Sequence, residues 1–378
     1  MNYEHRQDQQ TETGETMVEN RPLRTAFVGC GAISPLHLVG ISALDHIQLV
    51  GLADPNHQAA EALAGQAIRL TGQQPPAIYP SLTALLKEQA VDVVHVLTPH
   101  YTHVDLAIEA LEAGCHVLME KPPAIDLASL LNLQRVAKVS PGLLGLNLQN
   151  RYNFASQQAK KLLDAGTFGR VIATRGVVTW WRDSGYYQQS PWRGRWATEG
   201  GGLMINQAIH TLDLMLWLVG DPASISGQVA NVHLADVIEV EDTATAHIQF
   251  KNGATGVFFA TNAYPCSADP LLEIACEQAI LRIEGCDRLT VLDLTGNPLQ
   301  GFSQIVKTEE DPAARAAAAF VPADKAYWGL SHAILIADFY RSIRDRQPFA
   351  IDAGEGSRAL TTLLKLYQAS RSGERQYF

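Results

Sequence analysis

Cysteine is scarce in this chain: there are five among 378 residues, scattered and without a Cys-x-x-Cys pair. This pattern excludes a disulfide-stapled domain and favours the reducing environment of the cytoplasm. No metal-ligand spacing stands out beyond His100 and His103, which are three residues apart. We therefore predict a cytoplasmic protein that binds no metal.

The chain also has few positively charged residues and no long apolar runs. The chain has 29 Lys and Arg against 39 Asp and Glu, a formal charge of −10, which argues against a nucleic-acid partner. The apolar runs are far shorter than the roughly 18 residues that a membrane span needs. Residues 1–21 are polar and lack the apolar segment of a signal peptide. We predict no membrane contact and a disordered tail at 1–21.

What the chain has in quantity is an alternation of apolar strands and amphipathic helices in its first third. The near-continuous apolar character of these strands is typical of parallel strands that are covered on both faces. The strand-like runs lie at 23–31, 47–54, 91–99 and 115–122. The alternation predicts an α/β domain with a doubly wound parallel sheet, a Rossmann domain, at 22–145.

After about residue 150 the pattern changes to strand pairs. Residues 243–250 and 254–261 flank Lys251-Asn252-Gly253, with an Asn-Gly hairpin signal, and 272–285 has the pattern of another hairpin. Helices are predicted at 203–219, 330–346 and 354–371. We predict an α+β domain at 146–378 with a large, mostly antiparallel open sheet, whose last helix can pack back on the first domain.

A glycine-rich turn follows the first strand and opens a helix. Its glycines let the backbone approach a pyrophosphate, and the helix N-terminus supplies free N–H groups. Asp54 ends the second strand, where its carboxylate would accept hydrogen bonds from ribose hydroxyls and repel a 2′-phosphate. The predicted NAD-binding residues of this region are Gly29, Gly31, Ala32, Ile33 and Asp54, with NADP less favoured. The alternative is a glycine turn in another kind of α/β domain.

Two further groups of residues end neighbouring strands of the predicted sheet. Thr98 and Pro99, followed by His103, end the run at 91–97, and Glu120-Lys121 ends the next. Ligands of such sheets bind beyond the carboxyl ends of the strands. We therefore predict that all five residues face the cofactor.

The last motif is a triple glycine at 200–202 followed by Asn206, His210 and Asp213. On an α-helix these three share one face at i, i+4 and i+7. Together with the preceding motifs, in this order, the chain resembles the glucose–fructose oxidoreductase and myo-inositol dehydrogenase family from residue 23 to 372.

The resemblance implies an NAD-dependent dehydrogenase that acts on a hydroxyl-bearing carbon of a sugar, sugar acid, nucleotide sugar or polyol. It implies that Lys121 contacts cofactor and substrate and that His210 relays or accepts the proton of the hydroxyl. It also implies a homodimer or homotetramer that assembles through the antiparallel sheet. Asn206 stands where inositol dehydrogenases commonly have an Asp, which makes inositol a less favoured substrate.

The chemistry accounts for these residue types. Oxidation of an alcohol releases a hydride and a proton, and a lysine can take that proton only if its ordinary pKa of about 10.4 is depressed. A crevice closed by the positive nicotinamide lowers the pKa of Lys121 in this way, whereas His210 is expected to titrate near neutral pH unaided. The alternatives are a structural or cofactor-binding Lys121 and a core histidine at 210.

Aromatic and arginine side chains gather at 179–196, where four of the six tryptophans lie. Aromatic faces stack on sugars, and guanidinium groups bind carboxylate or phosphate. The predicted substrate-binding residues are Arg151, Trp192, Arg193, Asn206 and His210. The alternative for the aromatic segment is that it anchors a loop or a subunit interface.

Two other functions remain open at this point. One is a redox-neutral glycosidase that uses bound NAD transiently, and the other is a non-catalytic regulator that senses NAD. Intact Lys121 and His210 argue against the regulator.

The polar tail generates the first prediction. Because residues 1–21 lack apolar anchors, we expect their deletion to leave both the melting temperature and the affinity for NAD unchanged. Differential scanning calorimetry and NAD titration of the two forms check this. A large loss of stability would reveal a docking role for the tail.

Overall fold

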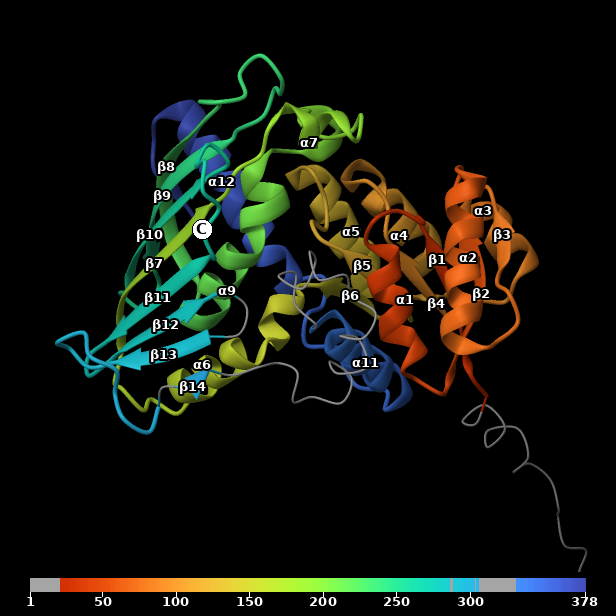
Figure 1. The fold of residues 1–378 in the computed structure, drawn as a ribbon, viewed down its shortest axis with the longest axis horizontal. Coiled ribbons are helices and arrows are strands. Elements are labelled where there is room, and N and C mark those ends of the chain that lie inside the picture. The colour runs from red at the N-terminus through yellow and green to blue at the C-terminus, as the bar shows by residue number, and fades with distance from the viewer. Residues whose placement is uncertain (1–20, 286–287, 303, 306–330) are drawn as a thin grey trace, which may run out of the picture.

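The protein consists of two domains built around two separate β-sheets, as its computed structural model shows (Figure 1). The structure describes residues 21–285, 288–302, 304–305 and 331–378. The predicted tail lies outside these residues except for Arg21, whose Nη1 donates to Asp92 Oδ2 at 2.6 Å. The prediction of disorder at 1–20 therefore stays a prediction.

The first domain is the predicted doubly wound sheet. Its six described strands lie in the order β3-β2-β1-β4-β5-β6, and all neighbours run parallel. Helices cover both faces, so strand residues such as Phe27 and Val94 are completely buried. The strands are β1 Leu23–Val28, β2 Ile47–Ala53, β3 Ala77–Tyr79, β4 Val93–Val96, β5 His116–Glu120 and β6 Leu144–Asn147. The helices are α1 Ser34–Ser42, α2 His57–Thr71, α3 Leu82–Glu88, α4 His103–Glu112 and α5 Leu127–Val139.

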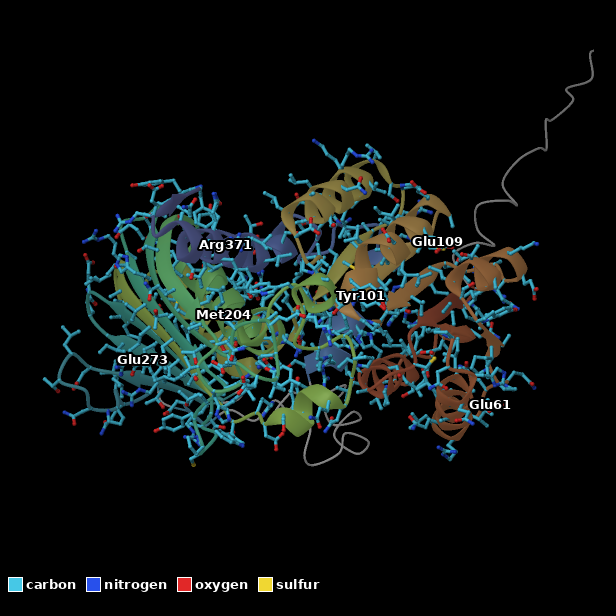
Figure 2. The ribbon with its side chains drawn as sticks, turned by 90° about the horizontal axis from the view of Figure 1, so that it is seen from above. Glu61, Tyr101, Glu109, Met204, Glu273 and Arg371 are labelled. Atoms are coloured by element: carbon cyan, nitrogen blue, oxygen red, sulfur yellow. The ribbon has the colours of Figure 1, made fainter. Side chains whose placement is uncertain are left out.

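The order of this sheet reverses between β1 and β4, because the chain adds β2 and β3 on one side and β4 to β6 on the other. At such a switch point the loops beyond the strands diverge and leave a crevice for a ligand. The glycine turn, Thr98 and Lys121 follow β1, β4 and β5 at this edge. Figure 2 shows Tyr101, from the loop after β4, on the side of the first domain that faces the second domain.

The second domain is a sheet of nine described strands with helices on one face. Among these strands only β7 and β10 pair in parallel, and all other neighbouring strands are antiparallel. Phe258 on β10 is 2% exposed and Val257 is 53% exposed, the alternation of a sheet with one open face. The order is β14-β13-β12-β11-β7-β10-β9-β8-β15.

The strands of this sheet are β7 Val171–Thr179, β8 Pro222–Ala230, β9 Thr243–Phe250, β10 Thr255–Thr261, β11 Leu271–Cys276, β12 Ile280–Glu284, β13 Arg288–Leu292, β14 Gln304–Ile305 and β15 Gln376–Tyr377. The helices are α6 Phe154–Asp164, α7 Ser184–Gln188, α8 Trp196–Glu199, α9 Ile209–Val219, α11 Ser331–Arg344 and α12 Arg358–Ser372. Both predicted hairpins are present, as β9–β10 and β11–β12.

The helix predicted at 203–219 is not a single α-helix. Met204–Ala208 form a π-helical turn, and α9 begins at Ile209. A π-turn is wider than an α-turn, so the spacing assumed between Asn206 and His210 does not hold across it. The stretch Trp196–Val219 is long and apolar enough by composition to cross a membrane, and 78% of its apolar window is buried inside the protein, as in a core helix.

The helix that packs on the first domain is α11, not the last helix. The hydroxyl of Tyr340 on α11 lies between Thr25 Oγ1 at 2.7 Å and His95 Nε2 at 2.9 Å. α12 packs instead against β8 of the second sheet. Both helices have an apolar stripe, and the stripe alone does not specify which sheet or helix covers it.

The close packing around the triple glycine generates the second prediction. A Cβ on Gly202 would lie 2.0 Å from the backbone oxygen of Glu241, so we expect Gly202→Ala to lower the free energy of unfolding by about 1–3 kcal/mol. The control is Gly65→Ala in α2, where a Cβ meets only Arg69 at 3.5 Å and the change should be neutral or stabilising by up to about 1 kcal/mol. Urea unfolding of both variants measures the free energy of unfolding. A Gly202→Ala protein as stable as the wild type would contradict the close contact between Gly202 and Glu241.

Candidate active site

The turn after β1 has the backbone conformation and the open space that a dinucleotide needs. Gly29 has a φ of +93°, and a Cβ there would lie 2.6 Å from the backbone oxygen of Leu97. Gly31 is exposed, and a Cβ on it would meet nothing within 4 Å. Ala32 is exposed and Ile33 half-buried, so the turn presents an accessible backbone to a pyrophosphate.

Asp54 lies beside this turn, at the end of β2. Its Oδ2 accepts a hydrogen bond from the amide of Cys30 and its Oδ1 from the amide of Asn56, both at 2.7 Å. A carboxylate oxygen can accept more than one hydrogen bond, so capacity remains for ribose hydroxyls. The neighbouring Pro55 and Asn56 carry no positive charge that would bind a 2′-phosphate. These residues fit an NAD molecule.

The loops that follow β4 and β5 are joined by His103. Its Nδ1 lies 2.8 Å from the backbone oxygen of Pro122, and its Nε2 lies 2.8 Å from that of Thr98. The His103 side chain is fully buried, whereas Thr98 and Pro99 are half-buried. His103 therefore positions two loops of the cofactor crevice, and its predicted direct contact with the cofactor stays a prediction.

Glu120 lies in a buried polar network one residue before Lys121. Its Oε1 accepts hydrogen bonds from His37 Nε2 at 2.9 Å and from the amide of Asn147. Although burial opposes it, the hydrogen bond from His37 keeps the pKa of Glu120 well below its usual range. A permanent negative charge therefore lies beside Lys121, and the 7% exposure of Glu120 leaves little of it accessible to a cofactor.

Lys121 reaches from the end of β5 to the second domain. Its Nζ donates to the backbone oxygen of Asn206 at 2.7 Å and to Asn206 Oδ1 at 3.1 Å. Burial lowers the pKa of Lys121 from its ordinary value, Glu120 and Glu199 act in the opposite direction, and Arg193 lowers it further. The net shift has the direction that a proton acceptor requires.

His210 belongs to the same cluster but does not titrate near neutral pH. Burial and then the charge of Lys121 lower the pKa of His210 to about 3. The prediction of a near-neutral pKa was therefore wrong, because it took no account of burial beside a cation. The Nδ1 of His210 is buried and has no hydrogen-bond partner among the residues that the structure describes.

Asp213 and Arg151 form a buried ion pair. Arg151 Nε and Nη2 donate to the two oxygens of Asp213 at 2.7 and 2.6 Å, and its Nη1 donates to Glu355 at 2.7 Å. Arg151 is 3% exposed and Asp213 is 1% exposed. This geometry favours a structural role for the pair, and the substrate contact predicted for Arg151 is still untested.

The aromatic segment forms a wall near His100. The guanidinium of Arg193 lies 4.5 Å from the ring centre of Tyr186 and 5.5 Å from that of Trp192. The Trp192 ring lies 4.7 Å from the ring of His100, which belongs to the first domain. The guanidinium of Arg182 lies 5.1 Å from Tyr186 as well.

Glu199 was not among the predicted site residues, yet it bonds to one of them. It is 1% exposed, and its Oε1 accepts a hydrogen bond from Asn206 Nδ2 at 2.6 Å. The available signal was a glutamate immediately before an apolar stretch that begins with three glycines. The sequence does not indicate that the Glu199 side chain is buried against Asn206, so only the folded structure reveals that this glutamate belongs to the site.

The structure thus brings together Lys121, Asn206 and His210 from two domains, with Glu199 behind them. Among the described residues no group of three His, Cys, Asp or Glu could hold a metal ion. The arrangement can hold a polar substrate beside a lysine of lowered pKa, next to a crevice that fits NAD.

The chain belongs to the GFO/IDH/MocA family of oxidoreductases. Residues 23–147 match the oxidoreductase family with an NAD-binding Rossmann fold, and residues 156–282 match the GFO/IDH/MocA C-terminal domain. The resemblance inferred from the motifs is confirmed, and so is the fold class.

Several similar proteins are named dehydrogenases. D-glucoside 3-dehydrogenase of Escherichia coli (strain K12) is 25% identical over 297 residues, 72% of this chain and 77% of the relative. UDP-N-acetylglucosamine 3-dehydrogenase of Acidithiobacillus ferrooxidans is 26% identical over 354 residues, 91% and 96% of the two chains. The WlbA dehydrogenase of Bordetella pertussis, solved with NADH and UDP-GlcNAcA, superposes with a TM-score of 0.80 at 29% identity, covering 95% of this chain and 98% of that chain. This chain is an NAD-dependent dehydrogenase.

The position of Asp54 generates the third prediction. The double variant Asp54→Ser, Pro55→Arg removes the charge that repels a 2′-phosphate and adds one that attracts it. We expect it to narrow or reverse the preference for NADH over NADPH. Calorimetric titration of both cofactors measures the change. A wild-type preference for NADPH would contradict the role assigned to Asp54.

Proposed function

We propose that this dehydrogenase reversibly oxidises a hydroxyl-bearing carbon of a carbohydrate that carries an anionic group, such as a sugar acid or a nucleotide sugar. The observation that carries the proposal is the position of Lys121. Its ammonium is bonded to Asn206 across the domain boundary, and its pKa is lowered by burial and by Arg193. Such a lysine is suited to exchange a proton with a substrate hydroxyl.

The oxidation consists of two transfers. Bound NAD⁺ supplies the acceptor for the hydride that leaves the carbon. The hydroxyl proton passes to neutral Lys121, so a carbonyl group forms, and the lysine ammonium returns a proton in the reverse direction. His210 is neutral at working pH and can exchange a hydrogen bond with the same hydroxyl, which orients it toward Lys121.

Two arginines support an anionic substrate. The Nε atoms of Arg182 and Arg193 are buried and lack a hydrogen-bond partner within the described part of the chain. Both guanidinium groups lie against Tyr186, and Arg193 is close enough to Lys121 to affect its pKa. A carboxylate or phosphate would satisfy these donors. Two of the relatives are named for, or bound to, nucleotide sugars.

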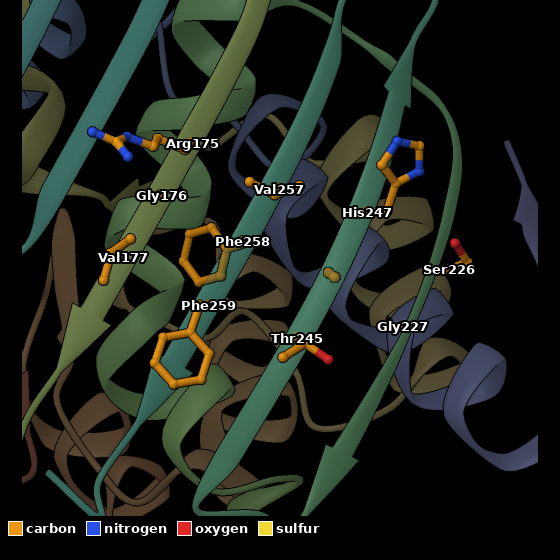
Figure 3. A pocket seen from close by; sticks show the side chains of 11 residues that line it. Arg175, Gly176, Val177, Ser226, Gly227, Thr245, His247, Val257, Phe258 and Phe259 are labelled. Atoms are coloured by element: carbon orange, nitrogen blue, oxygen red, sulfur yellow. The ribbon is translucent and has the colours of Figure 1, made fainter.

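The open face of the second sheet supports the predicted homodimer or homotetramer. Its strands carry a shallow cavity of about 430 Å³ whose lining includes Val257, Phe259, Val177 and His247, and Figure 3 shows these side chains on neighbouring strands. Val257 is 53% exposed and Phe259 37%. A second copy would cover this apolar surface. We propose a cytoplasmic location from the scarcity of cysteine.

The proton-transfer roles generate the fourth prediction. We expect Lys121→Ala and His210→Ala to lower kcat by about 10²- to 10⁴-fold, with the larger loss for the lysine variant because it also removes a positive charge beside the substrate. The measurement is single-turnover hydride transfer, after a panel of sugars, sugar acids and nucleotide sugars has identified a substrate by NADH formation. The affinity for NAD should change far less than kcat.

The control is Lys138→Ala, which removes an exposed lysine from the last turn of α5. Its rate should equal that of the wild type. Wild-type hydride transfer in both Lys121→Ala and His210→Ala would place the chemistry elsewhere.

A further inference from the structure

The carboxylate of Glu199 stands behind the pair of Lys121 and Asn206, and the proton transfer described above gives it no role. Its Oε1 accepts from Asn206 Nδ2 at 2.6 Å and its Oε2 from the amide of Gly194 at 2.5 Å. The backbone oxygen of Glu199 lies 2.9 Å from His100 Nδ1 in the first domain. The residue is 1% exposed and touches both sides of the crevice.

The direction of the Asn206 amide determines what Lys121 meets. An ammonium group only donates hydrogen bonds, so Lys121 needs the oxygen of the amide, which lies 3.1 Å from its Nζ. The amide nitrogen then points away from Lys121 and requires an acceptor, which Glu199 supplies. Without that acceptor the amide could turn over and direct its N–H groups at the ammonium, donor against donor.

We propose that Glu199 is a positioning residue of the dehydrogenase reaction: its carboxylate holds the Asn206 amide in the orientation that keeps an oxygen on Lys121. The inference rests on the proton-transfer role proposed for Lys121. Glu199 acts on Lys121 through Asn206.

Charged groups from both domains face Glu199. Burial raises the pKa of Glu199 to about 7, Glu241 contributes to the rise, and the hydrogen bonds to its two oxygens and the charge of Arg193 act against it. Glu199 in turn raises the pKa of Lys121. The remaining titratable neighbours are His100, Tyr186, Tyr187 and Tyr367. The two hydrogen-bond donors at its carboxyl oxygens, the Gly194 amide and Asn206 Nδ2, favour the ionised form of Glu199. Only the ionised carboxylate can accept both hydrogen bonds without a proton on either oxygen.

The test is Glu199→Gln, studied in the NADH-bound protein. Glutamine has nearly the same shape, but one of its two terminal atoms is a donor, so it cannot accept both hydrogen bonds. We expect the pKa of Lys121 to fall by on the order of 0.5–1 unit, because a nearby negative charge and a fixed oxygen contact are lost together. Carbon-13 NMR of labelled lysine side chains, with the Lys121 signal assigned by its loss in Lys121→Ala, measures this shift without a substrate.

The kinetics of the same variant give a second readout. We expect kcat to fall about ten- to hundred-fold, because Lys121 is no longer held in position. The affinity for NADH should stay unchanged. The rising limb of kcat/KM against pH should move to lower pH, since the base loses its proton at lower pH. A merely structural role would reduce the rate without moving this limb.

Two further variants make the design specific. Glu239→Gln removes a half-exposed carboxylate that pairs with Arg195, and it should alter neither the pKa of Lys121 nor kcat. In Asn206→Ala the link between Glu199 and Lys121 is already absent. Adding Glu199→Gln to Asn206→Ala should then cause no further loss of kcat, because the two residues act on Lys121 as one unit.

The outcomes separate the two proposals. An unchanged Lys121 pKa and kcat in Glu199→Gln would overturn the positioning role, and so would losses that add in the double variant. If Glu199→Gln does not fold, Glu199→Asp tests the same contact, since it keeps the charge but shortens the reach: kcat should fall with a smaller shift of the Lys121 pKa. If instead Lys121→Ala remains active while the NMR shift is present, the proposed function fails and the Glu199–Asn206–Lys121 link stands.

Discussion

The hydrogen bonds from Lys121 to Asn206 are the constraint on which the site depends, because they join the two domains at the reacting position. Lys121 ends β5 of the parallel sheet, and Asn206 lies in the π-turn before α9. Neither domain alone contains the pair. The helix α11 packs on the first domain through the hydrogen bonds of Tyr340 and so joins the two parts of the chain at a second place.

Burial sets the direction of the pKa shifts of Lys121, His210 and Glu199, and neighbouring charges modify them, whereas hydrogen bonding outweighs burial at Glu120. The carboxylate of Glu120 is held ionised by His37, whereas the pKa of Glu199 is raised to about 7. Against them stand the cations of Lys121 and Arg193, and the neutral imidazole of His210 completes the cluster. When Lys121 is in its neutral form, it can accept the proton of a substrate hydroxyl, which leaves as a carbonyl. The ammonium that then forms lies beside the Glu120 carboxylate, so its charge is compensated.

Signals that act over a few residues were sufficient for much of the fold. Gly29 is confined to glycine by its positive φ and by the nearby Leu97, and the Asn-Gly hairpin joins β9 to β10 as its turn chemistry requires. The first sheet followed from alternating apolar strands and helices. The choice of α11 over α12 as the helix that packs on the first domain was not predictable, because both helices have an equally suitable apolar stripe.

The sequence by itself determined the family, the fold class and the position of Lys121 at the end of a parallel strand, because each depends on residue types at short spacing along the chain. Only the tertiary structure decided the electrostatics. The pKa of His210, the pairing of Arg151 with Asp213 and the inward position of Glu199 depend on groups far apart in the sequence and on burial. The energy of a charge is determined by the distance to its neighbours and by its access to water, and both are properties of the folded chain.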